Sequence, residues 1–222
     1  MTILSYYNVE TLPLQSSPVS TIKFNNFLTE QEKEYFRQYT NYNLNKRDHS
    51  PFISNTYSLF DCEDLLVLKN KFNEAVKIYT QDVLNTSELH FRLVGSWFTR
   101  NTLDTAHDVH YHPNSMLSAV TYFDDEVDLN DYIQGIVFCQ DKFSSIFPDF
   151  KFTFNKLKPS VWNLYNYEKY TIRPKYNDVI IFPSHLYHRS EINTTESRFC
   201  IGANYFVTGK LFGSDTYSSI DI

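Results

Sequence analysis

Long apolar runs, clusters of basic residues and glycine are all scarce in this chain of 222 residues. No segment is long and apolar enough to span a membrane, and the first residues, MTILSYYNVETLPL, lack the basic start and apolar middle of a signal peptide. The net charge is −6 and no block of Lys and Arg occurs, unlike the basic footprint of nucleic-acid-binding proteins. We therefore expect partners that are neither membranes nor nucleic acids.

Cysteine is rare as well. Cys62, Cys139 and Cys200 are far apart in the sequence, and an odd number cannot all pair within one chain. This pattern predicts reduced, mostly buried thiols and a cytoplasmic protein. The aromatic content is high, at 17%, which favours strands over disorder.

Two segments before residue 90 have helical patterns. Thr29 and Glu32 have the spacing of a capping box, which predicts a helix over about residues 30–41. A second helix is predicted near residues 62–84, where apolar residues recur at spacings of three and four. Its apolar stripe consists of Leu65, Leu68, Phe72, Val76, Tyr79 and Val83. Such a stripe is typical of core packing, and we interpret it so.

After about residue 90 the pattern changes to short alternating runs of the kind that form strands. The runs are HFRLVGSWFTR, MLSAVTYFDD, GIVFCQ, SVWNLY, KYTIRP, DVIIFPS and RFCIGANYFV. Turn-forming segments separate them, as in an all-β sandwich or barrel. No linker or repeat divides the chain, so we expect one domain. It would comprise a helical support region over about 1–89, a β-sandwich core over about 90–207 and a tail over 208–222.

Histidines are concentrated in the predicted β-rich part, in two groups. His107, His110 and His112 form the first group, and His185 and His188 form the second. Side chains two residues apart on a strand point to one face, so His110 and His112 would point the same way. Two such groups indicate a metal site assembled across a sheet. Iron(II) oxygenases bind their metal through three protein ligands, usually two histidines and a carboxylate.

One strand carries an arginine among small residues. Arg198, Cys200, Gly202 and Asn204 would share one face of RFCIGANYFV, which indicates a cavity and a guanidinium that binds an anion. The alternative is an arginine that pairs with a carboxylate on the outside of the sheet. Tyr122 could donate to the same anion, or it could be an ordinary core tyrosine.

Two stretches together resemble a known family. They are HYHPNSMLSAVTYF at 110–123 and YTIRPKYNDVIIFPSHLYHRSEINTTESRFCIGANYF at 170–206, and GSWFTRN at 95–101 adds a third motif. They resemble the 2-oxoglutarate/Fe(II)-dependent oxygenases related to prolyl 4-hydroxylases, over roughly residues 90–207. With the alternating runs, this predicts a mainly β fold with α-helices. A double-stranded β-helix (jelly-roll) core would carry the N-terminal helices packed on its outside.

The resemblance implies roles for individual residues. His110 matches the first iron ligand and His188 the distal one, while Arg198 matches the arginine that binds the far carboxylate of 2-oxoglutarate. Tyr122 matches the tyrosine that assists this arginine, and His185 falls outside the ligand position. The implied cofactors are Fe(II) and 2-oxoglutarate as cosubstrate. The implied reaction uses O₂ to hydroxylate an unidentified small molecule or peptide, with release of succinate and CO₂.

The chain departs from the family pattern at position 112. The family has His-x-Asp or His-x-Glu where this chain has His110 and His112, so the third ligand is open. His112 shares a face with His110, and Asp108 shares it too and is the competitor. We predict a site made by His110, His112 and His188.

Two other functions compete with an oxygenase. A cupin also places His-x-His on a strand, but the Glu and glycines expected around that motif are absent. A non-catalytic binding module that retains the oxygenase scaffold is the second alternative, and His112 is its best support. Residues 124–160 begin with an acidic run and could form a lid that favours a basic or neutral substrate. The sequence identifies neither the substrate nor the oligomeric state.

Overall fold

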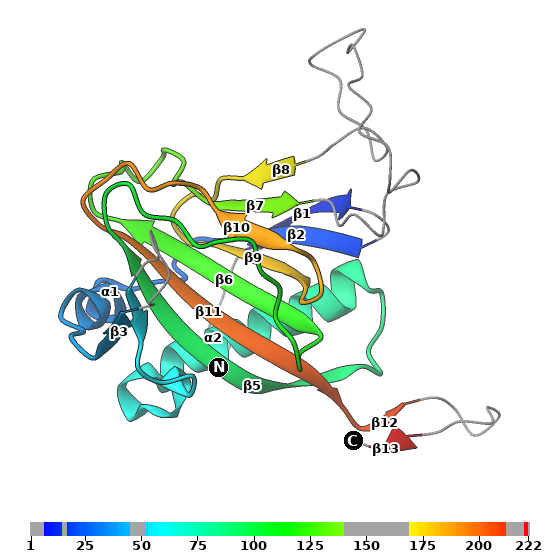
Figure 1. Ribbon diagram of the computed structural model, residues 1–222. Helices are drawn as coiled ribbons and strands as arrows, with labels where there is room; N and C mark the ends of the chain where they lie inside the picture. Colours follow the sequence, from blue (N-terminus) through cyan, green and yellow to red (C-terminus); the bar gives the residue numbers. More distant parts are fainter. Residues whose placement is uncertain (1–6, 15–16, 45–51, 140–168, 212–219, 222) are drawn as a thin grey trace, which may run out of the picture.

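A large antiparallel sheet forms the frame of the molecule (Figure 1). The computed structural model describes residues 7–14, 17–44, 52–139, 169–211 and 220–221. In spatial order the strands of the main sheet are β1 (Tyr7–Leu14), β2 (Ser17–Phe24), β9 (Asp178–Pro183), β6 (Leu117–Asp124), β11 (Arg198–Thr208), β5 (His90–Asn101), β4 (Phe52–Ser54) and β3 (Tyr42–Leu44). Neighbouring strands are antiparallel throughout this sheet.

A smaller sheet packs against one face of the main sheet. Its order is β10 (His188–Ser190), β7 (Ile136–Cys139) and β8 (Lys169–Ile172), and β12 (Lys210–Leu211) pairs separately with β13 (Ile220–Asp221). Ile136 and Phe138 of β7 share an apolar cluster with Val120 of β6 and Phe182 of β9. Two antiparallel sheets packed in this way form the expected jelly-roll core, so the predicted fold class is confirmed.

The two faces of the main sheet have different surroundings. On β11, Phe199, Ile201 and Ala203 belong to the larger apolar cluster, whereas Arg198 and Cys200 point to the side of the smaller sheet. This alternation follows from the period of two along a strand. One face therefore packs into the main core, and side chains of the other face line a pocket.

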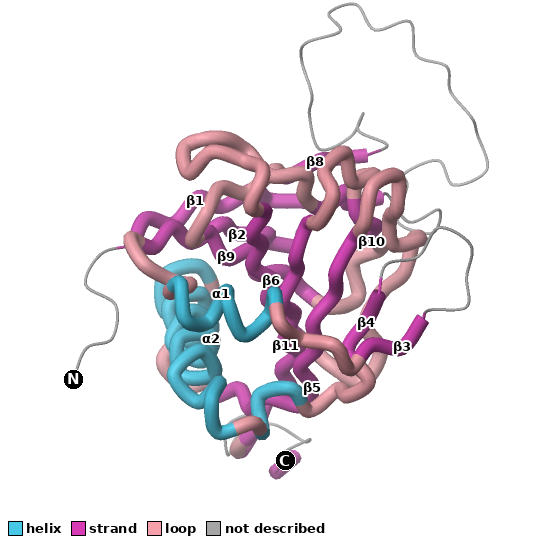
Figure 2. Tube along the Cα trace, turned by 90° about the vertical axis from the view of Figure 1, so that its left-hand side faces the viewer, coloured by secondary structure: helices cyan, strands magenta, loops and turns pink. Residues whose placement is uncertain are grey.

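The helices lie on the face opposite the smaller sheet (Figure 2). Helix α1 (Glu30–Arg37) has the predicted capping box at Thr29, and helix α2 (Leu66–Ile78) is preceded by a short 3₁₀ helix and followed by a π-helical turn. Helix α1 ends at Arg37, earlier than predicted. Helix α2 itself ends at Ile78, and the π-helical turn Tyr79–Val83, in which Leu84 N–H donates to Tyr79 O, extends the helical region close to the predicted end.

The predicted apolar stripe of α2 packs into the core. Leu65, Leu68, Phe72, Val76 and Tyr79 are buried in the same cluster as the inner side chains of the main sheet. Val83 packs against this cluster from its edge. The interpretation of the stripe as core packing is confirmed.

The N-terminal region also contributes strands that the sequence analysis did not predict. β1 to β4 lie within residues 1–89, which were interpreted as helical support. In β2, residues 19–22 are all buried, because the strand lies inside the sheet and both its faces are covered. Such a strand lacks the alternation that reveals a half-buried one. The predicted strand SVWNLY and residues 140–160 of the predicted lid lie outside the described residues.

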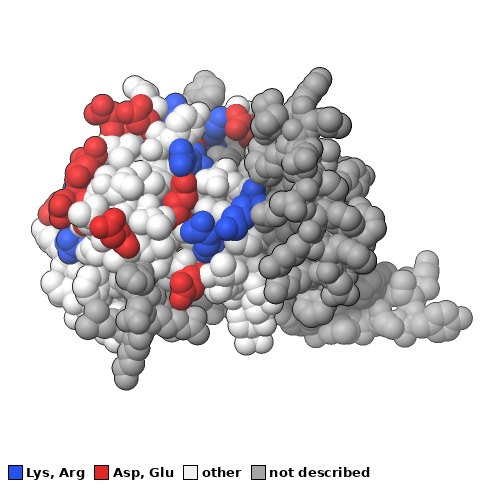
Figure 3. Space-filling view, turned by 45° about the horizontal axis from the view of Figure 1, so that its top comes forward, with Lys and Arg blue, Asp and Glu red and all other residues white. Residues whose placement is uncertain are grey.

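Charged side chains of both signs occur on the face shown in Figure 3. Arg37 pairs with Asp125, with nitrogen–oxygen distances of 2.8 and 2.7 Å, and Arg173 pairs with Glu191 at 2.8 Å. Asp125 belongs to the acidic run after β6, so part of that charge is neutralised by α1. The acidic residues after β6 therefore give less support to a basic substrate.

Two further expectations concern thiols and membranes. Cys62, Cys139 and Cys200 are all free, and each is half-buried rather than fully buried. None of the helices in the described part of the chain has the length and apolar character that a membrane crossing requires.

Candidate metal centre

Three histidines come together at one end of the space between the two sheets. His110 and His112 lie on the segment between β5 and β6, and His188 begins β10. One ligand atom from each lies within 4.8 Å of the others, and among the described residues this is the one group of three such donors. The ring centroids are 4.4 to 5.2 Å apart. A group of this size fits the ligand shell of one metal ion.

The backbone fixes this arrangement through a single β-bridge. His110 N–H donates to His188 O and His188 N–H donates to His110 O, both at 2.8 Å. His112 N–H donates to Ser184 O at 3.0 Å. The segment 110–112 is therefore held in extended form against the end of β9 and the start of β10. His110 and His112 consequently point to one side, as their spacing predicts.

Two of the rings are oriented by backbone carbonyls. His110 Nδ1 lies 2.7 Å from Asp108 O, and His188 Nδ1 lies 2.8 Å from Leu186 O. A carbonyl only accepts, so each Nδ1 carries the proton and donates it. In that tautomer Nε2 of each ring carries the lone pair that a metal ligand needs.

Two of the three clustered histidines, His112 and His188, are held in the neutral form. Burial, together with the nearby His110, lowers the pKa of His112 to about 3. Burial also lowers the pKa of His188 well below its ordinary value. Neutral imidazole is the form that coordinates a metal, so these rings need not lose a proton to do so near neutral pH.

Two half-buried imidazoles, those of His107 and His112, should make the stability of the metal-free protein depend on pH. The folded-state pKa values of His107 and His112 are about 3, against 6.5 for the ordinary group. Both groups contribute their full stability above pH 6.5, and this stability is lost as pH falls toward the folded value, because only the unfolded chain binds the proton. Each group costs up to about 1.4 kcal/mol per pH unit within that window.

Urea unfolding at a series of pH values between 7 and 5 measures this dependence. In a His107→Gln variant the unfolding free energy should fall less steeply with decreasing pH, because about one proton fewer is taken up on unfolding. Parallel pH profiles for the two proteins would contradict the assignment of His107 as a half-buried neutral group.

The competing ligand, Asp108, points elsewhere. Its side chain is exposed, and the contact that it makes near the histidines is through its backbone carbonyl. It does not belong to the group of three donors. The structure therefore brings His112, not Asp108, next to His110 and His188, while the ligand role of His112 stays a prediction.

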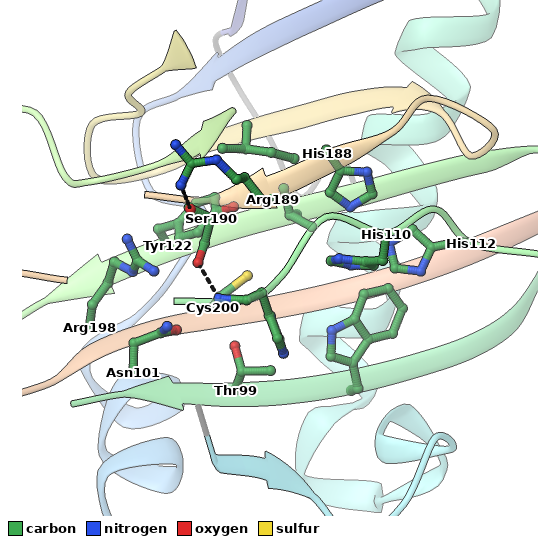
Figure 4. A pocket seen from close by; sticks show the side chains of 14 residues that line it. Thr99, Asn101, His110, His112, Tyr122, His188, Arg189, Ser190, Arg198 and Cys200 are labelled. Atoms are coloured by element: carbon green, nitrogen blue, oxygen red, sulfur yellow. Dashed lines mark hydrogen bonds between the residues drawn. The ribbon is translucent and has the colours of Figure 1, made fainter. Parts of the chain in front are cut away.

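Arg198 lies at the other end of the same pocket (Figure 4). It is fully buried, and its Nη1 donates to Gln134 O at 2.8 Å and to Glu191 O at 3.3 Å. Its Nε and Nη2 have no hydrogen-bond partner. None of the ion pairs within the described residues includes Arg198. A buried cation with two unused donors fits an anionic ligand that enters the pocket.

Tyr122 also lines the pocket, from β6. Burial raises its pKa well above the ordinary value, so the phenol is neutral. The structure places Tyr122 opposite Cys200 in the β6–β11 pair and in the same pocket as Arg198. Its assistance to Arg198 remains a prediction.

His185 does not belong to the pocket. It is exposed at the turn between β9 and β10, where Ser17 Oγ lies 3.4 Å from its Nε2. His107, whose role was left open, does line the pocket and packs 5.5 Å from the His110 ring. Its backbone N–H donates to Ser190 Oγ at 2.7 Å, which ties the segment to β10.

Sequence reasoning missed the wall that β5 contributes. Trp97, Thr99 and Asn101 alternate along this strand and line the pocket. The centroid of the Trp97 ring lies 5.0 Å from that of the His112 ring. The indole fits there because Gly202 has no side chain, whereas a Cβ at this position would lie only 2.4 Å from the ring. The motif GSWFTRN shows that the three residues are spaced by two and share a face of the strand. It does not show which strand lies next to them.

A jelly roll that presents three imidazoles and a buried arginine with two unpartnered donors in one pocket has the features of a non-haem iron oxygenase. A family model described as "Putative 2OG-Fe(II) oxygenase" matches residues 95–204, which include all of these side chains. This region of the chain belongs to the 2-oxoglutarate/Fe(II)-dependent oxygenase family. No curated protein sequence is significantly similar to it.

Solved structures share the fold at low sequence identity. A prolyl hydroxylase from Trichoplax adhaerens, solved with a peptide of hypoxia-inducible factor, is 13% identical with a TM-score of 0.53, covering 85% of this chain and 83% of that one. A prolyl-4-hydroxylase from Pseudomonas putida is 14% identical with a TM-score of 0.50, covering 85% and 91%. The carbocyclase SnoK of nogalamycin biosynthesis is 14% identical with a TM-score of 0.54, covering 86% and 81%. These similarities concern the fold.

Proposed function

We propose that this chain is a hydroxylase that binds Fe(II) through His110, His112 and His188 and binds 2-oxoglutarate through Arg198. The observation that carries the proposal is the pair of unused Arg198 donors in the pocket that the three histidines also line. When bound, iron and 2-oxoglutarate supply the oxidative chemistry, in which O₂ converts 2-oxoglutarate to succinate and CO₂ and hydroxylates the substrate.

The residues of the chain provide binding, orientation and a dry environment. The carbonyls of Asp108 and Leu186 hold two imidazole rings with Nε2 toward the metal position. The buried guanidinium fixes the far end of the cosubstrate, and Tyr122 adds a neutral hydroxyl beside it. This leaves the near end of the cosubstrate, with its 2-oxo acid, to face the histidines.

The substrate is a small molecule or a peptide, and the fold does not choose between them. One structural neighbour is a prolyl hydroxylase solved with a peptide, and another is a carbocyclase. The three free cysteines support a reducing, cytoplasmic location. A non-catalytic binding module remains the second candidate, because a histidine replaces the usual carboxylate at position 112.

The test combines metal analysis with turnover. Protein purified without oxygen and loaded with Fe(II) should hold about one iron per chain and release succinate from 2-oxoglutarate when O₂ is admitted. Candidate peptides and small molecules that accelerate succinate release identify the substrate class. A folded protein that neither retains iron nor consumes 2-oxoglutarate would instead be a binding module.

A further inference from the structure

Asn101 is a buried side chain of the pocket that the proposed function leaves unused. It ends β5, is 1% exposed and lines the pocket from the side opposite the smaller sheet. Its backbone carbonyl accepts from Asn193 Nδ2 at 3.0 Å, but its own side-chain Nδ2 has no hydrogen-bond partner. A buried amide donor without a partner is unfavourable and rare in folded proteins.

The register of the sheet places this amide beside Arg198. Asn101 is the direct partner of Arg198 in the β5–β11 pair, so the two side chains are neighbours on one face. Figure 4 shows both at the end of the pocket away from the three histidines. Together they supply three unpartnered donors, Arg198 Nε, Arg198 Nη2 and Asn101 Nδ2.

The nearest carboxylates are engaged in other contacts. Asp124 accepts from Thr195 Oγ1 at 2.6 Å and from Glu126 N–H at 3.0 Å. Glu191 accepts from Arg173 and from Gly135 N–H. The three donors are therefore left for a group that enters from outside, and a carboxylate with two oxygens matches a guanidinium and an adjacent amide.

We infer that Asn101 and Arg198 together bind the far carboxylate of the cosubstrate, so that Asn101 is a binding residue that helps select a dicarboxylic 2-oxo acid. This inference rests on the proposed function, because it concerns the same cosubstrate. Arg198 supplies the charge, and Asn101 supplies a neutral donor whose place at the end of β5 fixes where the second carboxylate oxygen lies.

The experiment compares two ligands by calorimetry on Mn(II)-loaded protein without oxygen. The ligands are 2-oxoglutarate and 2-oxopentanoate, which has the same carbon chain without the far carboxylate. Asn101→Leu removes the donor at similar volume, and Asn101→Ala is a second variant should the leucine prevent folding. The matched control is Asn70→Ala, because Asn70 is exposed on α2.

Asn101→Leu and Asn101→Ala should each weaken 2-oxoglutarate binding about tenfold or more, as expected for the loss of one hydrogen bond to a charged group. Binding of 2-oxopentanoate should be unchanged. The Tm of the ligand-free variants should equal or exceed that of the parent protein, because the deleted donor had no partner. Asn70→Ala should change none of these quantities.

Two results would overturn the inference. One is unchanged 2-oxoglutarate affinity in both Asn101 variants while Arg198→Ala weakens it, which leaves the proposed function intact. The other is an equal loss of affinity for both ligands together with a lower Tm, which indicates a structural role. If the parent protein itself does not prefer 2-oxoglutarate to 2-oxopentanoate, the proposed function fails as well.

Discussion

Replacing Arg198 with alanine is expected to weaken 2-oxoglutarate binding by about a hundredfold or more while leaving Fe(II) content unchanged. The guanidinium is fully buried with two unpartnered donors, so a carboxylate that reaches it forms charge-assisted hydrogen bonds away from water. The histidines lie at the other end of the pocket and do not depend on it for their orientation. The measurements are the 2-oxoglutarate concentration that gives half-maximal succinate release and the iron content.

Two further variants define the contribution of geometry. Arg198→Lys should recover only part of the affinity, because an ammonium group cannot reproduce the planar fork of the guanidinium. Arg92→Ala is the matched control, since Arg92 is exposed on β5. Should Arg198→Ala bind 2-oxoglutarate as tightly as the parent protein, the assignment of the anion pocket is wrong.

The prediction of Arg198 from the sequence depended on the period of two along one strand. Arg198 and Cys200 were expected on a face different from that of Phe199 and Ile201, and the structure places them so. Alternation within a strand is a local property, and the order of residues along the strand reveals it when one face carries small and polar residues. His110 and His112 were predicted to share a side for the same reason.

The remaining pocket residues could not be predicted because their positions depend on pairing between distant strands. Asn101 became a candidate only when the register placed it opposite Arg198. That register includes an irregularity between Asn204 and Tyr205, which no local pattern indicates. His107 was visible as a histidine, but its place in the pocket depends on a hydrogen bond to Ser190, far along the chain.

The histidine at position 112, where the family has a carboxylate, changes the charge of the site. A carboxylate ligand would add one negative charge beside the metal, and His112 adds none. The half-buried imidazole of His112 is neutral, with a pKa lowered to about 3, and it lies against Trp97. We expect Fe(II) to bind more weakly than in a site with a carboxylate, and the ferric state to be harder to reach, because less negative charge offsets that of the metal.

His112→Ala should therefore remove iron and abolish turnover. The variant leaves two imidazoles to bind the metal. Loss of one of three protein ligands should lower metal affinity by about a hundredfold or more, which is a larger loss than that from removing a group that only orients a ligand. His112→Asp should restore the familiar set of two histidines and one carboxylate, and should retain iron and part of the activity. Asp108→Ala should bind iron normally, since its exposed carboxylate lies outside the group of donors and the backbone carbonyl that orients His110 is kept.

Iron content and succinate release of the three variants, purified without oxygen, decide between the two possible ligands. Trp97 fluorescence gives a second readout of metal binding, because its ring lies 5.0 Å from that of His112. If Asp108 is the third ligand, the pattern reverses: Asp108→Ala loses the metal and His112→Ala keeps it. An iron-replete His112→Ala protein with normal turnover would reject the three-histidine site. His112 lies next to both other imidazoles, and its backbone is fixed by a hydrogen bond to Ser184. We therefore expect His112→Ala to be the variant that loses iron.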